Sequence, residues 1–379
     1  MARTLCMFLA LSLTLGHGDA LARNGGGLRR LIARVKTVFR GGGAFGGPLV
    51  VGGQCSTRNL LPDGKARGFV IAAIGSAGEV ATDWLPKLKT IGNDIGRYEF
   101  RQTTSQRPTR RQNFDALVLK TLRRLGHQPK QIAGKFVLEN SGASGACPGY
   151  PQAVMAAAQQ AGAPTIGVSP HAKVKTHRKH NAPYQGFDVI QLTKPTRAQL
   201  NAYWRGKAIV ERGLAAKDQS PSLLAQLKQL LRGKPELPAY TYRTEQLIHT
   251  SDVAVVLNGR TGTTEEAMTT LEAGKPLIVV ESSGGVAKGL APLVNVIRNA
   301  GKRFLVIDAR SAASLNRALA ALPNESAMIN VGGRPKRRGL VIFTNDATRV
   351  VPLATIAAAW REHALATEGK AVLLPLGDN

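Results

Sequence analysis

Aromatic residues are scarce in this chain. Only 5% of its 379 residues are aromatic, whereas 43% are hydrophobic and glycine is abundant. This composition favours an α/β fold with closely packed helices over an all-β sandwich. Aromatic side chains are also the stacking platforms of sequence-independent single-strand binding proteins, so their scarcity counts against that function.

Acidic residues are few compared with basic ones. The chain has 51 Lys and Arg against 24 Asp and Glu, which gives a formal net charge of +27. An excess of this size attracts phosphates, nucleic acids and anionic membranes without selecting one of them. We therefore expect non-specific binding to anionic polymers or membrane surfaces. Specific binding of single-stranded DNA stays an alternative.

Cysteine is rare, and no group of cysteines and histidines has the spacing of a zinc site. One of the three cysteines, Cys6, lies in a predicted leader, which leaves Cys55 and Cys147. These two could form a disulfide in an oxidising compartment, or they could be two buried thiols. Residues 171–180 contain three histidines, but the basic residues among them would repel a cation. We predict neither a metal site nor a cofactor.

The first 22 residues have the layout of a secretory signal peptide. Arg3 precedes an apolar run at residues 5–15 that is too short to span a bilayer comfortably, and residues 20–22 form an A-x-A site. We expect export to the periplasm or outside the cell. A misplaced start codon or a buried N-terminal helix is the alternative.

Residues 23–65 form a basic N-terminal segment. Between residues 28 and 40, apolar residues recur at helical spacing among five basic ones. Such a helix would dock on the body of the protein or lie on an anionic membrane surface.

From residue 66, apolar runs alternate with helical patterns. The expected strands lie within residues 67–78, 134–141, 163–170, 187–193, 252–259, 275–282 and 302–308. Strands that alternate with helices predict right-handed βαβ units and a parallel sheet covered on both faces, which is a Rossmann-like α/β fold. We expect this domain at residues 66–325, with polar, irregular insertions at about 80–112 and 194–236. A C-terminal extension at 326–379 would add a basic turn, a strand and a helix around Trp360.

Two Gly-rich turns follow the first two strands, and parallel α/β sheets bind ligands at that edge. The first turn is Ile74–Gly78, and the second, Asn140–Gly149, precedes a helix that begins near Pro151. Free N–H groups at such a helix start form an anion site. The candidate binding residues in these two turns are Gly75, Ser76, Gly142, Ser144 and Gly145.

A third Gly-rich turn, in the stretch "LNGRTGTTEEAM" at Leu257–Met268, also leads into a helix. A phosphate would fit its glycine backbone, its hydroxyl groups and the helix N-terminus. The turn is neither a Walker loop nor a G-x-G-x-x-G dinucleotide fingerprint. Its candidate phosphate-binding residues are Gly259, Arg260, Thr261, Gly262 and Thr263.

Glu266 has two interpretations. Beside a phosphate, its carboxylate could stabilise an oxocarbenium-like centre or act as a general base, with Arg243 holding the anion. Alternatively, Thr263 and Glu266 form a capping box at the start of the helix. The residue types alone favour the cap.

Residues 242–285 resemble the signature of the Lonely guy (LOG) family of the SLOG group of Rossmann-like proteins. The shared pattern is an Arg on a helix, a strand, a G-G-x-G-T-x-x-E motif, a helix and G-K-P. Residues 141–170 and 69–78 are similar to the family's Gly-rich loop and first strand. The resemblance covers about residues 66–325. It implies nucleotide binding, and characterised LOG enzymes hydrolyse the N-glycosidic bond of nucleoside 5′-monophosphates and are commonly dimers.

Carried over by position, the resemblance implies that Gly259, Gly262 and Thr263 hold the phosphate. It also implies that Glu266 is the catalytic acid and Arg243 its basic partner. Arg260 stands where the family has its second glycine. The alternative function is an exported, non-catalytic protein that binds nucleotides or another phosphorylated ligand. A two-domain glycosyltransferase would need a second Rossmann domain, for which residues 23–130 are too irregular.

Overall fold

The computed structural model describes ten parts of the chain. They are residues 49–52, 70–98, 106–128, 137–141, 149–170, 187–193, 237–296, 303–331, 333–366 and 374–375. The predicted signal peptide, the basic amphipathic helix, both remaining cysteines, the histidine-containing stretch and the second insertion lie outside them. Gly142, Ser144 and Gly145 do so too. Among the described residues, no helix is long and apolar enough to cross a membrane.

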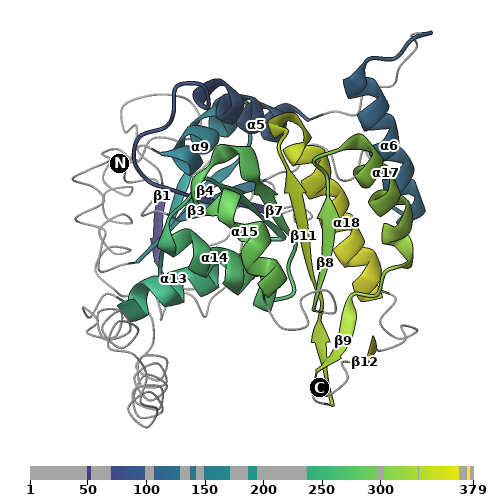
Figure 1. Cartoon of the computed structure of the whole chain (residues 1–379). Helices are drawn as coiled ribbons and strands as arrows, with labels where there is room; N and C mark the ends of the chain where they lie inside the picture. Colours follow the sequence, from purple (N-terminus) through teal and green to yellow (C-terminus); the bar gives the residue numbers. More distant parts are fainter. Residues whose placement is uncertain are drawn as a thin grey trace, which may run out of the picture.

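A nine-stranded sheet, in which all neighbouring strands run parallel, forms the centre of the molecule (Figure 1). Its strands, in spatial order, are β1 Leu49–Gly52, β5 Val189–Thr193, β4 Thr165–Pro170, β3 Val137–Ser141, β2 Val70–Gly75, β6 Val253–Leu257, β7 Leu277–Val280, β11 Gly339–Thr344 and β8 Phe304–Asp308. The predicted Rossmann-like α/β fold is confirmed.

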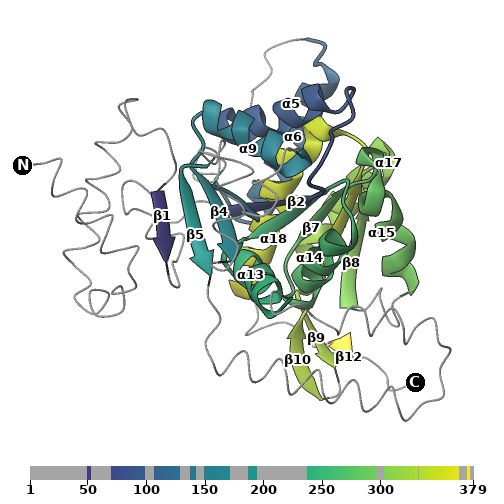
Figure 2. The same ribbon diagram turned by 90° about the vertical axis from the view of Figure 1, so that its left-hand side faces the viewer.

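Helices cover both faces of the sheet (Figures 1 and 2). One face carries α5 Leu85–Arg97, α6 Arg110–Arg124, α9 Tyr150–Gln160, α17 Ala312–Ala321 and α18 Val350–Ala366, and the other carries α13 Leu237–Thr250, α14 Thr261–Glu272 and α15 Gly285–Val296. Successive strand residues alternate between the two cores, because side chains in a strand point to opposite faces. Ile71 and Ala73 lie in the first core, whereas Ala72 and Ile74 lie in the second.

The strand order changes direction between β2 and β6. From β2 the chain adds β3, β4 and β5 on one side, and then it returns to place β6 and β7 on the other side. Such a switch point opens a crevice at the carboxyl ends of the two central strands, where α/β proteins bind ligands. The turns after Gly75 and Leu257 lie at this place.

The described part of the predicted insertion at 80–112 contains helix α5 and the start of α6. Helix α5 packs against α9 and buries Leu88, Ile91 and Ile95 at helical spacing. The prediction of an irregular segment was wrong because these apolar positions are diluted by lysines, glycines and other polar residues. Pro86 lies in the first turn of α5, where its missing N–H costs no hydrogen bond.

The chain after residue 325 contributes a strand to the central sheet. Strand β11 pairs with β7 on one side and β8 on the other, so the expected boundary at residue 325 divides this sheet. The helix predicted around Trp360 is α18, and Trp360 is 1% exposed in the first core. A separate three-stranded sheet has the order β10 Arg334–Arg337, β9 Met328–Val331 and β12 Leu374–Pro375. Strands β9 and β10 precede β11 in the chain, and β12 follows α18.

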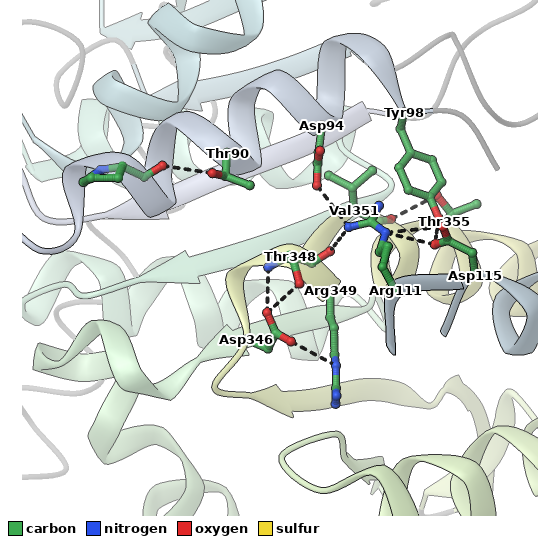
Figure 3. Close-up of polar contacts among 11 residues, drawn as sticks. Thr90, Asp94, Tyr98, Arg111, Asp115, Asp346, Thr348, Arg349, Val351 and Thr355 are labelled. Atoms are coloured by element: carbon green, nitrogen blue, oxygen red, sulfur yellow. Dashed lines mark hydrogen bonds and ion pairs between the residues drawn. The ribbon is translucent and has the colours of Figure 1, made fainter. Parts of the chain in front are cut away.

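A polar cluster joins the segment between β11 and α18 to helices α5 and α6 (Figure 3). Arg111 lies 3.1 Å from a carboxylate oxygen of buried Asp115 and 3.5 Å from Asp94, and it donates to the carbonyl of Thr348 at 3.0 Å. The Tyr98 hydroxyl donates to Asp115 at 3.3 Å, and burial, followed by the charge of Asp115, raises the pKa of Tyr98. These groups satisfy one another, so the cluster fixes helix positions.

Candidate functional site at the strand switch point

The three predicted turns meet around Gly75 at the end of β2. A Cβ atom on this glycine would lie 2.2 Å from the carbonyl oxygen of Leu257 and 3.3 Å from the ring of Pro151. The amide of Tyr150 donates to the carbonyl of Ser76 at 3.2 Å. Gly75 therefore lets the end of β6 and the start of α9 approach β2 closely. The described parts of the three turns lie together at the switch point.

Asn258 shapes the start of the third turn. Its φ of 59° places it in the left-handed region, which asparagine tolerates better than most residues. Its amide donates to the hydroxyl of Ser283 at 2.6 Å, and its side chain donates to the Ser283 carbonyl at 2.9 Å. The Asn258 Oδ1 atom accepts from the amide of Gly259 at 2.7 Å. Asn258 thus ties the turn to the segment after β7.

Gly285 completes this contact. Its φ is +53°, and a Cβ atom there would lie 2.3 Å from Asn258 Oδ1 and 2.6 Å from the carbonyl of Gly259. The amides of Val286 and Ala287 donate to the carbonyls of Gly259 and Asn258 at 3.1 and 3.0 Å. These amides at the N-terminus of α15 are therefore hydrogen-bonded to the neighbouring turn.

Thr263 holds the next part of the turn. Its hydroxyl accepts from the amide of Arg260 at 3.4 Å, and its own amide donates to the Arg260 carbonyl at 2.8 Å. Gly259, with φ of +113°, has its Cα against this threonine, because a Cβ would lie 2.6 Å from Thr263 Cγ2. Thr263 is 3% exposed, so it supports the turn from inside.

Arg260 does not need the conformational freedom of glycine. Its φ of −130° and ψ of −166° correspond to extended backbone, which any residue can adopt. Arg260 is exposed. An arginine is therefore compatible with the backbone at this position. It adds an exposed cation directly before the first turn of α14.

The N-terminus of α14 has free donors at the switch point. Thr261 and Gly262 are its first two residues, and amides at these positions have no intrahelical partner. Gly262 is exposed, with open space where its Cβ would be. Residues four apart lie on one helix face, so Gly262 lies one turn above Glu266. The missing side chain at 262 leaves room over that face.

Arg243 and Glu266 form a buried ion pair between α13 and α14. Arg243 Nη1 lies 2.7 Å from Glu266 Oε1, and the two residues are 7% and 5% exposed. The capping-box interpretation was wrong. Helix α14 begins at Thr261, which puts Thr263 at the third helical position and Glu266 beyond the reach of the free N–H groups.

Burial raises the pKa of Glu266, while the charge and hydrogen bond of Arg243 act in the opposite direction. A carboxyl group taken from water pays a desolvation cost in its charged form, so it holds its proton to higher pH. The pair thus combines a carboxyl group with altered acidity and a fixed cation, which is a combination that enzymes use in acid–base chemistry.

Asn258 and Ser283 were not among the candidate residues from the sequence. Asn258 lies in the third Gly-rich turn, where only the residues from Gly259 onward were candidates, and the local signal at Ser283 is the pair of glycines that follows it. Among the described residues, no group of His, Cys, Asp and Glu could hold a metal ion.

These features define a doubly wound α/β domain with its candidate site at the strand switch point. Residues 134–320 match the family model described as SLOG in TRPM, prokaryote. This part of the chain is therefore similar to SLOG proteins, which agrees with the predicted resemblance to the SLOG group. Strands β2 and β11 lie outside the matched range but inside the same sheet.

Two solved structures are similar to the chain at low identity. The X-ray structure of TM1055 is 16% identical, covering 59% of this chain and 81% of that one, with a TM-score of 0.31. The molybdenum cofactor carrier protein MCP from Chlamydomonas reinhardtii is 15% identical, covering 62% of this chain and 88% of that one, also with a TM-score of 0.31. At this level neither structure informs on the ligand of this chain. No curated protein matches it.

Proposed function

We propose that the SLOG domain binds a nucleotide, with its phosphate at the N-terminus of α14. The observation that carries the proposal is the convergence of three Gly-containing turns at the switch point between β2 and β6. A helix N-terminus offers amide donors and a partial positive charge to an anion. Open space at Gly262 leaves these donors approachable, and exposed Arg260 adds a charge beside them.

The finer proposal is hydrolysis of a nucleoside 5′-monophosphate. Water adds to the anomeric carbon, the N-glycosidic bond breaks, and the free base and ribose 5-phosphate leave. Glu266 is the group that would move the proton, because it lies one helical turn below the proposed phosphate position and burial raises its pKa. Arg243 would hold the carboxyl group in place through its 2.7 Å contact.

The test is to incubate the purified protein with the common nucleoside monophosphates and measure free base by chromatography. Glu266→Gln keeps an acceptor for Arg243 but cannot transfer the proton, so base release should fall by about 10²-fold or more. Glu265→Gln is the matched control, because its side chain is exposed on the same helix. That variant should release base at the wild-type rate.

A non-catalytic binding protein is the second candidate. The observation in its favour is the burial of both Arg243 and Glu266 against each other. In that case nucleotides would raise the melting temperature without any release of base, and Glu266→Gln would change neither result. Absence of base release from every monophosphate would overturn the hydrolase. Absence of a melting shift with any nucleotide would overturn nucleotide binding altogether.

A further inference from the structure

The opposite end of the sheet carries a strand rich in basic residues. Strand β10 has the sequence RPKR, pairs antiparallel with β9 and is followed almost directly by β11. Because β11 runs parallel to β7, β10 lies at the amino ends of the strands. In Figures 1 and 2 this small sheet projects from the end of the molecule away from α5 and α9. It is therefore separate from the switch-point turns.

Two cavities lie between this strand and the ends of α13 and α14. The first has a volume of about 440 Å³ and is lined by residues that include Lys275, Arg337 and Arg361. The second, of about 310 Å³, is lined by residues that include Arg303, Lys336 and Arg337. Arg337 belongs to both linings, so the two cavities are neighbours.

Positive charge predominates in the combined lining. Besides those five basic residues, it contains the carboxylates of Glu245 and Glu272 and the imidazole of His249. An excess of cations around a concave surface focuses its field on an anionic ligand. Two cavities of this kind side by side suit an anion that carries more than one phosphate group.

Not every cation has the same role. The Lys275 ammonium donates to the carbonyls of Ile248, His249 and Ser251, at 2.7 Å for His249, so it neutralises the C-terminal end of α13. Arg361 lies 4.0 Å from a carboxylate oxygen of Asp252. These two basic residues are committed to the fold, and they add background charge.

Arg337 and Lys336 are positioned differently. Both are exposed and belong to β10. The backbone of Arg337 lies against Gly274, where a Cβ would be 2.3 Å from Arg337 Cβ. Gly274 therefore lets the strand approach the end of α14 and places the arginine at the junction of the two cavities. Arg303, over the ring of Phe304 at 5.9 Å, completes the second cavity.

From this arrangement we infer that the amino-end cavities bind a small anion with two or more phosphate groups, with Arg337 between neighbouring phosphates. A guanidinium presents several donors in a fixed plane, which suits phosphate oxygens. The site is separate from the switch-point turns and from the nucleotide proposed there.

Tripolyphosphate is the probe, and its binding to the full chain is measured by titration calorimetry at 150 mM salt. The double variant Lys336→Ala with Arg337→Ala removes two exposed cations from the lining. The double variant Lys120→Ala with Arg317→Ala removes two exposed cations elsewhere, on α6 and α17, and changes the net charge equally. Arg260→Ala serves as the variant for the switch-point site.

We expect saturable binding that weakens by about tenfold or more in the β10 double variant, because charge-assisted hydrogen bonds are lost. The α6/α17 double variant should bind within about twofold of wild type. Equal weakening in both double variants would overturn the inference in favour of unspecific charge. Loss only in Arg260→Ala, or binding of oligonucleotides at β10 without binding of tripolyphosphate, would overturn it as well.

Discussion

The two ends of the central sheet offer positive potential to an anion by different means. At the carboxyl end, the candidate site is built mainly from backbone: a helix N-terminus, glycines in close contact and an asparagine in the left-handed region. At the amino end, the candidate site is built from long basic side chains on β10 and neighbouring elements. A backbone site is broken by one added methyl group. A side-chain site weakens in steps as charges are removed and as salt is added.

The largest expected effect concerns a cation that belongs to the fold. Lys275→Met keeps the volume of the side chain but leaves the carbonyls at the end of α13 without their charged donor. We expect a loss of about 3 kcal/mol in the free energy of unfolding, measured by urea denaturation.

Arg337→Met is the matched control, because this arginine lines the same cavity but is exposed. It should change the stability by no more than about 0.5 kcal/mol. A similar loss in both variants would contradict the division between cations that support the fold and cations that face a ligand.

The second prediction concerns pH and the buried pair at the carboxyl end. Burial raises the pKa of Glu266, so the folded protein holds this proton more tightly than the unfolded chain does. The protonated carboxyl therefore adds stability that is full below about pH 4.3, the unfolded value, and is lost as the pH rises through the raised pKa.

Unfolding curves of wild type and Glu266→Gln between pH 4 and pH 8 isolate this contribution. The stability of wild type relative to Glu266→Gln should fall as the pH rises. A relative stability that grows with pH would show that the attraction of Arg243 outweighs burial and that the carboxylate is ionised in the folded protein.

The strands of the sheet were largely predictable, whereas their order was not. Runs such as residues 253–257 and 277–280 are short, apolar and bounded by turn residues, which indicates buried parallel strands. The position of β11 between β7 and β8 depends on pairing between residues far apart in the chain. No local pattern around Gly339–Thr344 encodes it.

The contact between Arg243 and Glu266 was predictable from the family pattern but not from the local chemistry. Thr263 and Glu266 fit a capping box when only their spacing is considered. Helix α14 begins two residues before Thr263, and Glu266 meets Arg243 from another helix. The contacts of Asn258 with Ser283 join two separate turns, so they could be seen only once the fold had brought β6 and β7 together.

The prediction with the smallest change in stability is also the most direct test of the proposed phosphate position at the N-terminus of α14. Gly262 and Gly289 are both exposed helical glycines with open space at the Cβ position, on α14 and α15 respectively. Alanine has the higher helix propensity, so either substitution should keep or raise the stability, by up to about 1 kcal/mol. Only Gly262 adjoins the proposed phosphate position.

The decisive measurement is therefore the affinity of Gly262→Ala and Gly289→Ala for the nucleoside monophosphate that gives wild type its largest melting shift. We predict that Gly262→Ala folds as stably as wild type but binds at least about tenfold more weakly, because the new methyl group occupies the space over the helix N-terminus. Gly289→Ala should bind like wild type. Unchanged affinity in a stable Gly262→Ala protein would contradict the assignment of the phosphate to the first turn of α14.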